Sequence, residues 1–388
     1  MRVRRCVAGA REFAAGAAVR NEPARPCRIL GVESTCDESG VALIEGRRIV
    51  SERLASQWQL TREYGGVFPT MSARQHAANL PRLYLDMLDT MKVDRNDQLR
   101  LDAVAVAAGP GLSPCLDVGL RFAKGICEAH SVPLVAVNHL EAHVLVSHLV
   151  DDELAFPYLA LIVSGGHTQL LYCKGVGRYD ILGTTHDDAI GEAFDKVARV
   201  LQIEPQPGDS YGRALERCAS SCRSPATIAF PVAMSRRTDC DFSYSGLKAA
   251  VKRVVEAEGD QVLSDEKRAA IAAAFQEAAV SQVASRLRRA LQGHVDPATA
   301  TTIVLGGGVA SNQAIQRCVR QVADQHRLRV VCPPATLCSD SAVSIAYAGA
   351  LKFALGHCDP LTVGYSPRWP LGSQVSRSQP HVNESPCI

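Results

Sequence analysis

The stretch Arg28-Ile-Leu-Gly-Val-Glu-Ser-Thr-Cys-Asp-Glu-Ser-Gly-Val-Ala-Leu-Ile-Glu45 decides the fold of this 388-residue chain. Its two apolar runs, residues 28–33 and 40–45, have the length and composition of strands, and the polar loop 34–39 joins them. The same pattern returns at residues 158–163 and 168–173, around a second tight loop. The repeat predicts a duplicated α/β fold with two lobes and a central cleft.

Further strands and helices follow each hairpin. In the first lobe we expect strands at 49–56, 102–108 and 132–137, and helices at 73–90 and 116–129, the former interrupted by Pro81. In the second we expect strands at 180–185, 302–305 and 329–332, and helices at 188–201, 265–291, 309–323 and 339–353. The predicted N-terminal lobe therefore covers residues 28–150, and the C-terminal lobe, with its closing helix, covers residues 151–371.

Composition excludes several classes of protein. Hydrophobic residues make up 47% of the chain and charged residues 21%, which is ordinary for a globular protein, and the net charge is only +2. No apolar run approaches the ~18 residues that span a bilayer, so we expect no membrane association. The 14 cysteines include no C-x-x-C pair. They indicate reduced thiols rather than a disulfide framework.

Both ends of the chain differ from its middle. Residues 1–27 are rich in Arg and Ala and poor in acids, as in a mitochondrial transit peptide, and we expect a protein of the mitochondrial matrix. An untargeted, disordered leader is the alternative. Residues 372–388 are rich in Ser, Pro and Gln, and we expect a disordered tail.

A pair of histidines follows the predicted strand 132–137. In His139-Leu140-Glu141-Ala142-His143 the two imidazoles lie one helical turn apart, a spacing that can bind one Zn or Fe ion if a third ligand comes from elsewhere. The alternative is that both are ordinary polar residues on a helix. A protease of the H-E-x-x-H type is disfavoured, because Glu141 points away from the face that carries both histidines.

Three tight loops, at residues 34–37, 164–166 and 306–308, could bring backbone N–H groups to a phosphate, and the last two contain glycine. None is a Walker A loop, and none is a G-x-G-x-x-G turn in a Rossmann unit. Spread over two similar lobes, the loops resemble the nucleotide cleft of the actin, hexokinase and Hsp70-like (ASKHA) superfamily.

Six motifs in a fixed order carry a closer resemblance. They are Gly31-Val-Glu-Ser-Thr-Cys-Asp-Glu-Ser39, Asn138-His-Leu-Glu-Ala-His143, Val163-Ser-Gly-Gly-His-Thr-Gln169, Asp187-Asp-Ala-Ile-Gly-Glu-Ala-Phe-Asp-Lys196, Phe242-Ser-Tyr-Ser-Gly-Leu-Lys248 and Gly306-Gly-Gly-Val-Ala-Ser-Asn312. With them, the chain resembles the TsaD-type tRNA adenosine threonylcarbamoyltransferases from about residue 28 to residue 371.

The resemblance implies transfer of a threonylcarbamoyl group from threonylcarbamoyl-AMP to N6 of the adenosine 3′ of the anticodon in ANN-decoding tRNAs. It implies one divalent metal ion, Zn or Fe, on His139, His143 and Asp340. It implies catalytic carboxylates at Asp37 and Glu38, of which one could act as a base. The residues that it assigns to the adenylate are Ile162, Val163, Ser164, Gly165, Gly166, Asp195, Gly208 and Asn312. Its implied partners are tRNA, a separate adenylate-forming enzyme and a second copy of the chain.

Two motifs depart from the family pattern. Cys338-Ser-Asp-Ser-Ala342 stands where the family usually has Cys-Thr-Asp-Asn-Gly, and Gln206-Pro-Gly-Asp209 stands where it has Pro-Gly-Gly-Pro. The first change puts the surroundings of Asp340 in question. The altered motif leaves open an inactive tRNA-binding member of the family. The shared loops leave open a small-molecule kinase of the same superfold.

Overall fold

The computed structural model describes residues 26–64, 66–92, 99–206, 208–223, 228–259, 262–295 and 299–374. The chain divides into two compact units. Unit 1 comprises Met1–Phe156, Gly175–Arg178 and Pro333–Leu371, and unit 2 comprises Pro157–Lys174, Tyr179–Cys332 and Gly372–Ile388. Within the described ranges, no helix is long and apolar enough to cross a membrane.

Unit 1 is built on a five-stranded sheet with the order β3-β2-β1-β4-β5. The strands are β1 (Arg28–Glu33), β2 (Glu38–Glu45), β3 (Arg48–Ser56), β4 (Ala103–Gly109) and β5 (Leu134–Asn138). β1 pairs antiparallel with β2 and parallel with β4, which in turn pairs parallel with β5. The predicted hairpin is therefore confirmed, and the two parallel strands extend the sheet on its other side.

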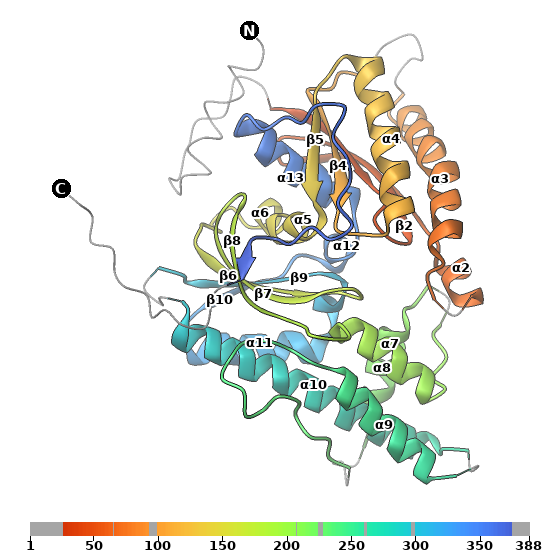
Figure 1. Cartoon of the computed structure of the whole chain (residues 1–388), viewed down its shortest axis with the longest axis vertical. Coiled ribbons are helices and arrows are strands. Elements are labelled where there is room, and N and C mark those ends of the chain that lie inside the picture. Colours follow the sequence, from red (N-terminus) through yellow and green to blue (C-terminus); the bar gives the residue numbers. More distant parts are fainter. Residues whose placement is uncertain are drawn as a thin grey trace, which may run out of the picture. The chain divides into compact units, whose positions relative to one another are not determined.

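Helices cover both faces of this sheet, as Figure 1 shows. On one face α3 and α4 pack on side chains such as Leu30 and Val41, and on the other α5 and α13 pack on Ile29 and Ala42. The helices of unit 1 are α2 (Trp58–Glu63), α3 (Pro69–Thr90), α4 (Ser113–His130), α5 (His139–Leu145), α6 (Ser147–Val150), α12 (Ala335–Cys338) and α13 (Ala342–Ala354). Burial on both faces explains why the strands are almost continuously apolar.

Unit 2 repeats the same topology. Its sheet has the order β10-β9-β6-β7-β8-β11, so β6 to β10 occupy the positions of β1 to β5. The strands are β6 (Tyr158–Val163), β7 (Thr168–Gly175), β8 (Arg178–Thr184), β9 (Thr302–Gly306), β10 (Arg329–Val331) and β11 (Ser373–Gln374). β6 again pairs antiparallel with the next strand and parallel with a later one, β9. This shared order confirms the duplication predicted from the sequence.

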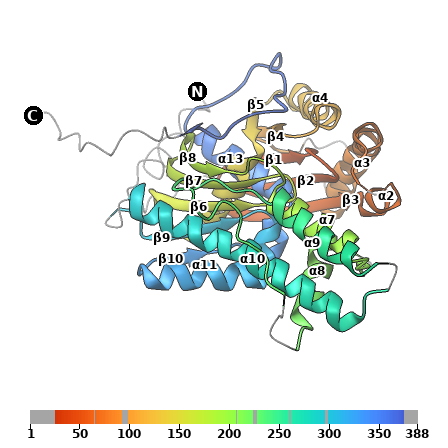
Figure 2. The same ribbon diagram turned by 60° about the horizontal axis from the view of Figure 1, so that its bottom comes forward.

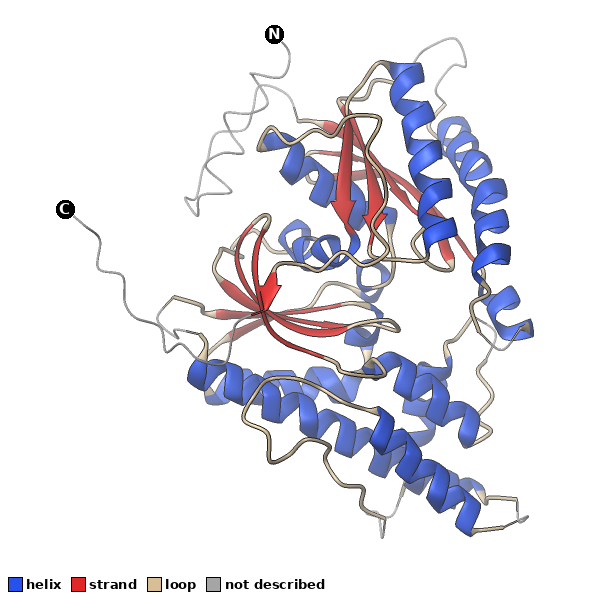
Figure 3. Cartoon of the chain, in the orientation of Figure 1, coloured by secondary structure: helices blue, strands red, loops and turns tan. Residues whose placement is uncertain are grey.

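Between β8 and β9 the regular elements that the structure describes are helices, drawn blue in Figure 3 and joined by loops drawn tan. α10 and α11 lie side by side on the same side of the sheet (Figure 2). The helices of this unit are α7 (Ile190–Val200), α8 (Tyr211–Ser220), α9 (Ser245–Ala257), α10 (Asp265–Gly293), the 3-10 turn η1 (Gly308–Ser311) and α11 (Gln313–Gln325). We did not predict α8 and α9, which are short and have few buried residues.

The closing segment corrects the expected domain boundary. We expected residues 333–371 in the C-terminal lobe, yet they belong to unit 1. The close approach of α13 to β1 is the physical reason, because a Cβ at Gly31 would lie 2.2 Å from Ala342 O and 2.7 Å from Ala346 N. Only glycine at this position leaves room for the helix backbone.

Other boundaries also differ from the expected ones. Pro81 does not interrupt α3, whose neighbouring side chains Leu80 and Leu83 are buried against the sheet. The helix expected at 309–323 begins only at Gln313, after η1, and the one expected at 339–353 begins only at Ala342, as α13.

The two terminal predictions fare differently. The expected disordered tail starts with a strand, since Ser373 and Gln374 pair with β8. Residues 1–25 of the expected leader and residues 375–388 of the tail lie outside the described part of the chain.

Candidate functional site

The cap of α5 sets the direction of the histidine pair. Asn138, the last residue of β5, accepts hydrogen bonds on Oδ1 from the backbone N–H groups of Leu140 at 2.9 Å and Glu141 at 3.3 Å. Its Nδ2 donates to the carbonyl of Trp369 at 3.0 Å. An asparagine at this position satisfies N–H groups that have no partner inside the helix. The helix therefore begins at His139 and presents His139 and His143 on one face.

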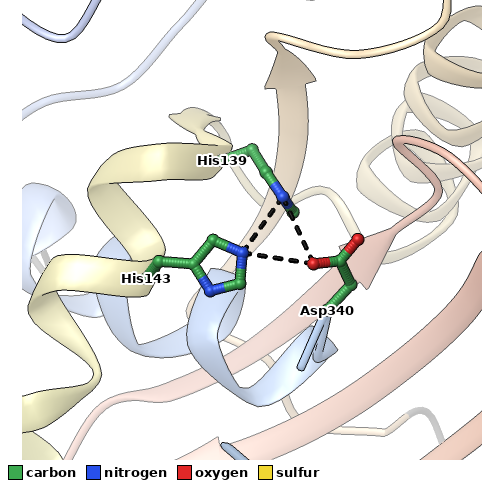
Figure 4. A group of neighbouring side chains, drawn as sticks. All are labelled: His139, His143 and Asp340. Carbon is green, nitrogen blue, oxygen red and sulfur yellow. Dashed lines mark hydrogen bonds and ion pairs between the residues drawn. The ribbon is translucent and has the colours of Figure 1, made fainter. Parts of the chain in front are cut away.

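His139, His143 and Asp340 converge in unit 1, as predicted (Figure 4). The two Nε2 atoms lie 3.2 Å apart, and Asp340 Oδ1 lies 3.1 Å from that of His143 and 3.4 Å from that of His139. Tetrahedral bonds of about 2.1 Å to a common ion would separate the ligand atoms by about 3.4 Å. Among the described residues this is the group able to hold a metal ion, and its dimensions fit one.

The charges of this group are coupled. Burial disfavours a charged His139 ring, but the carboxylates of Asp340 and Glu33 outweigh it and raise the pKa of His139 well above its usual value. Burial likewise opposes ionisation of Asp340, yet the two histidines hold the pKa of its carboxyl well below the usual range. Carboxylates that retain a proton on a buried ring also favour a bound cation at the same place.

Asp37 and Glu38 lie in the β1–β2 loop and at the start of β2, both partly buried. Asp37 Oδ2 accepts a hydrogen bond from Thr61 Oγ1 at 3.3 Å. Burial, then the charges of Asp37 and Asp340, raises the pKa of Glu38 well above its usual value. The charge of Asp340 therefore contributes to the pKa of Glu38. The predicted catalytic carboxylates and the predicted metal ligands thus interact electrostatically.

Glu141 has a structural partner away from the histidine face. Its Oε1 accepts from the backbone N–H of Gly177 at 2.8 Å, and its Oε2 lies 3.7 Å from Lys352 Nζ. The carboxylate is buried, with Gly177 and Lys352 as these partners. This geometry agrees with the rejection of a metalloprotease made from the sequence.

Only part of the predicted stretch 162–166 of unit 2 is exposed. Ile162 and Val163 are completely buried in β6, so their side chains are core residues and not ligand contacts. Ser164 closes the turn, accepting on Oγ from the N–H of His167 at 3.0 Å. Gly165 and Gly166 are exposed, and a Cβ at either would meet nothing within 4 Å. The open part of this loop is therefore the glycine pair.

The other predicted adenylate residues of unit 2 are Asp195, Gly208 and Asn312. Asp195 Oδ1 accepts from the N–H of Gly212 at the start of α8, at 2.7 Å. Gly208 is exposed and has φ +82°, which favours glycine. Asn312 caps α11 through a 3.0 Å bond from the N–H of Ile315 and donates to Gln276 at 3.2 Å. Its side chain is therefore already engaged in the fold.

Glycines outside the predicted set bring the motifs of unit 2 together. A Cβ at Gly191, in the first turn of α7, would lie 2.6 Å from Ser164 O and 2.7 Å from Val309 Cγ2. A Cβ at Gly307, which has φ +88°, would lie 2.4 Å from Val163 O. The ends of β6 and β9 and the start of α7 thus meet at positions where only glycine fits.

Several polar residues were missed from the sequence. Glu33, buried at the end of β1, lies 3.0 Å from His139 Nδ1 through its Oε2. Asp187 accepts from Ser243 Oγ, Ser245 Oγ and the N–H of Tyr244, which links two of the motifs. Both residues lie in motifs that carry the family resemblance, and this position could have identified them as candidates.

His76 contacts the β1–β2 loop from α3. It is completely buried in α3, with Nδ1 2.8 Å from Ser39 Oγ and Nε2 3.0 Å from Cys36 O. The ring therefore supports the β1–β2 loop that carries Asp37 and Glu38.

Comparison with known proteins gives consistent matches. Residues 48–347 match the sequence profile of the TsaD family, described as tRNA N6-adenosine threonylcarbamoyltransferase. A protein of that name from Novosphingobium aromaticivorans is 43% identical over 356 residues, which cover 90% of this chain and 97% of the relative. A protein from Arabidopsis thaliana named "Probable tRNA N6-adenosine threonylcarbamoyltransferase, mitochondrial" is 37% identical over 371 residues, which cover 90% of this chain and 76% of the relative.

Among solved structures, HypF from T. kodakarensis matches with a TM-score of 0.55 and 14% identity, over 84% of this chain and 48% of that one. At this identity the likeness concerns the fold alone. It confirms the duplicated ASKHA-type α/β fold predicted from the sequence.

Proposed function

This chain belongs to the TsaD family of tRNA N6-adenosine threonylcarbamoyltransferases. We propose that each of its two units supplies different groups to that reaction. Unit 1 provides the metal ligands His139, His143 and Asp340 and the acid–base carboxylates Asp37 and Glu38. Unit 2 provides the residues that hold the adenylate of the donor. The observation that carries the proposal is the convergence of three ligand atoms within 4.8 Å of one another.

The donor is threonylcarbamoyl-AMP, and the acceptor is N6 of the adenosine 3′ of the anticodon in ANN-decoding tRNAs. The new bond joins N6 to the carbamoyl carbon, and the bond between that carbon and the phosphate oxygen breaks. AMP leaves with the electron pair, and N6 loses one proton. One divalent ion, Zn or Fe, on the three ligands would supply Lewis-acid stabilisation of the negative charge that develops.

The chain's own side chains take the proton. A base must be within hydrogen-bond reach of N6 and have a pKa near the working pH. The raised pKa of Glu38, to which burial contributes most and the neighbouring Asp37 next, favours Glu38 as the group that exchanges the proton. The two carboxylates thus have different parts, although they are neighbours in the sequence.

In unit 2 the exposed glycines of the turn Ser164–Gly166, together with Gly208, provide open backbone for the phosphate and the nucleoside, and Asp195 provides a carboxylate for ribose hydroxyls. Asn312 acts through the position of α11, because its side chain caps that helix. Ile162 and Val163 act only as the strand that carries the turn.

We assign the chain to the mitochondrial matrix on two grounds: the Arg-rich residues 1–27 and the relative from Arabidopsis thaliana whose name includes "mitochondrial". Its partners in this proposal are tRNA, a separate enzyme that makes the adenylate, and a second copy of the chain in a homodimer.

The test uses purified protein, tRNA and preformed threonylcarbamoyl-AMP, with nucleosides analysed by mass spectrometry. We expect threonylcarbamoyladenosine in the parent and in Glu141→Gln, and a steep loss in His143→Ala. Absence of product from the parent would instead favour the inactive tRNA-binding alternative. Phosphorylation of a small molecule by ATP would favour the kinase alternative.

A second arm replaces the preformed adenylate with threonine, bicarbonate and ATP. Product should then require the adenylate-forming partner. Product without that partner would contradict the proposed division of labour between two enzymes.

A further inference from the structure

Glu33 ends β1 with a carboxylate that is completely buried. Each of its oxygens has one partner: Oε1 accepts from the N–H of Thr35 at 2.6 Å, and Oε2 lies 3.0 Å from His139 Nδ1. A buried carboxylate is costly unless hydrogen bonds satisfy it, so both contacts are needed for its burial. One of them fixes the orientation of a predicted metal ligand.

The contact decides which nitrogen of His139 is free to bind. A carboxylate only accepts, so Nδ1 carries the hydrogen, and the lone pair of the neutral ring is then on Nε2. Nε2 is the atom that faces His143 and Asp340. His143 has no such support in the described structure, because its Nδ1 is buried without a hydrogen-bond partner.

We propose that Glu33 is a positioning residue for metal binding, which holds His139 with Nδ1–H toward the carboxylate and Nε2 toward the ion. This inference rests on the proposed metal site. Carboxylate partners of this kind orient the ring and make it a better ligand, and their loss weakens metal binding about 10- to 100-fold.

Glu33→Gln is the informative substitution, because an amide cannot reproduce both contacts. Glutamine has one accepting oxygen and one donating NH₂ group, whereas Thr35 N–H and His139 Nδ1–H are both donors. If the NH₂ group faces His139, the ring must reverse its tautomer and present a hydrogen to the ion. Glu141→Gln is the matched control, since Glu141 is also buried but bonds to Gly177 instead.

The experiment measures the dissociation constant of Zn²⁺ by chelator competition and the absorption spectrum of the Co²⁺-loaded full-length protein. We expect Glu33→Gln to bind Zn²⁺ about 10- to 100-fold more weakly and to change the Co²⁺ bands. Glu141→Gln should leave both unchanged. A Zn²⁺ constant and Co²⁺ spectrum in Glu33→Gln equal to those of the parent would overturn the proposal.

A second measurement needs no variant at position 33, should Glu33→Gln fail to fold. In Zn²⁺-loaded parent protein labelled with ¹⁵N-histidine, we expect His139 to carry its hydrogen on Nδ1, with the signal assigned by its loss in His139→Ala. A hydrogen on Nε2 would refute the positioning role.

His143→Ala separates the two levels of the argument. Undiminished Zn²⁺ stoichiometry in that variant would reject the metal site itself. Lost stoichiometry there, together with unchanged Glu33→Gln, would reject only the role of Glu33.

Discussion

The hydroxyl of Ser341 donates a 2.6 Å hydrogen bond to Glu52 of β3 and accepts one from the N–H of Val343 at 3.1 Å. Ser341 follows the predicted ligand Asp340 and caps α13. The residue that departs from the family pattern therefore has both a helix-capping role and a partner on a neighbouring strand.

Ser341→Ala should destabilise the metal-free protein by about 1 kcal/mol, because it removes a helix cap and the donor to Glu52. Ser341→Asn, which restores the usual family residue, should cost less. Urea unfolding measures both. Ser339→Ala is the control, since that hydroxyl makes only a 3.4 Å contact with Thr336 O. Equal stability of Ser341→Ala and the parent would contradict the capping role.

Loss of any proposed metal ligand should remove the ion and most of the activity. His139→Ala, His143→Ala and Asp340→Asn should each lower metal stoichiometry, and kcat should fall on the order of 10²–10³-fold, as for loss of a group that stabilises transition-state charge. Elemental analysis and the tRNA modification assay measure the two effects. Full stoichiometry in the double variant His139→Ala/His143→Ala would exclude this site.

Gly31→Ala should severely destabilise unit 1, because the added methyl would overlap Ala342 O. The backbone of α13 must move, and with it the segment that carries Asp340. Gly125→Ala on the exposed side of α4 is the matched control, since a Cβ there meets nothing within 4 Å. It should stabilise the protein by up to about 1 kcal/mol through helix propensity. Thermal melting distinguishes the two, and similar melting temperatures would contradict the packing argument.

The fold was predictable where local pattern and tertiary packing agree. The hairpin of β1 and β2 and its repeat in β6 and β7 are apolar runs with short loops, and the structure confirms both. The path of the closing segment was not predictable, because it depends on the space that Gly31 leaves beside α13. Sequence spacing does not reveal such a contact between residues more than 300 positions apart.

The candidate site shows the same limit. One helical turn separates His139 from His143, so their convergence follows from helix geometry. Asp340, in contrast, was predicted as a metal ligand from the family resemblance alone. Glu33 and His76 were missed as buried supports, since burial of a polar side chain depends on its tertiary partners. Asn312 stays a predicted adenylate residue, and its role as the cap of α11 was not predicted from the sequence.

Substitution of Asp195 should act mainly on substrate binding. Asp195→Ala loses both the charge proposed for ribose hydroxyls and the bond to Gly212, whereas Asp195→Asn keeps an oxygen for that bond. Both variants should raise KM for threonylcarbamoyl-AMP more than they lower kcat. If only Asp195→Ala raises KM, the side chain supports α8 and does not bind the donor.

The stability of the protein should fall in acid because of His148 in α6. Burial, followed by the charge of Arg47, lowers the pKa of this histidine from 6.5 to about 4. The unfolded chain therefore takes up a proton on this histidine near pH 6.5, whereas the folded chain takes it up only near pH 4. The stabilisation is complete above pH 6.5 and is lost as the pH falls toward 4. At pH 5 the loss is about 2 kcal/mol, from 1.36 kcal/mol for each pKa unit. Urea unfolding between pH 4.5 and 7.5 should show a shallower pH dependence in His148→Gln than in the parent, while His357→Gln, at an exposed position, should follow the parent. Parallel curves for the parent and His148→Gln would show that His148 is not the group responsible.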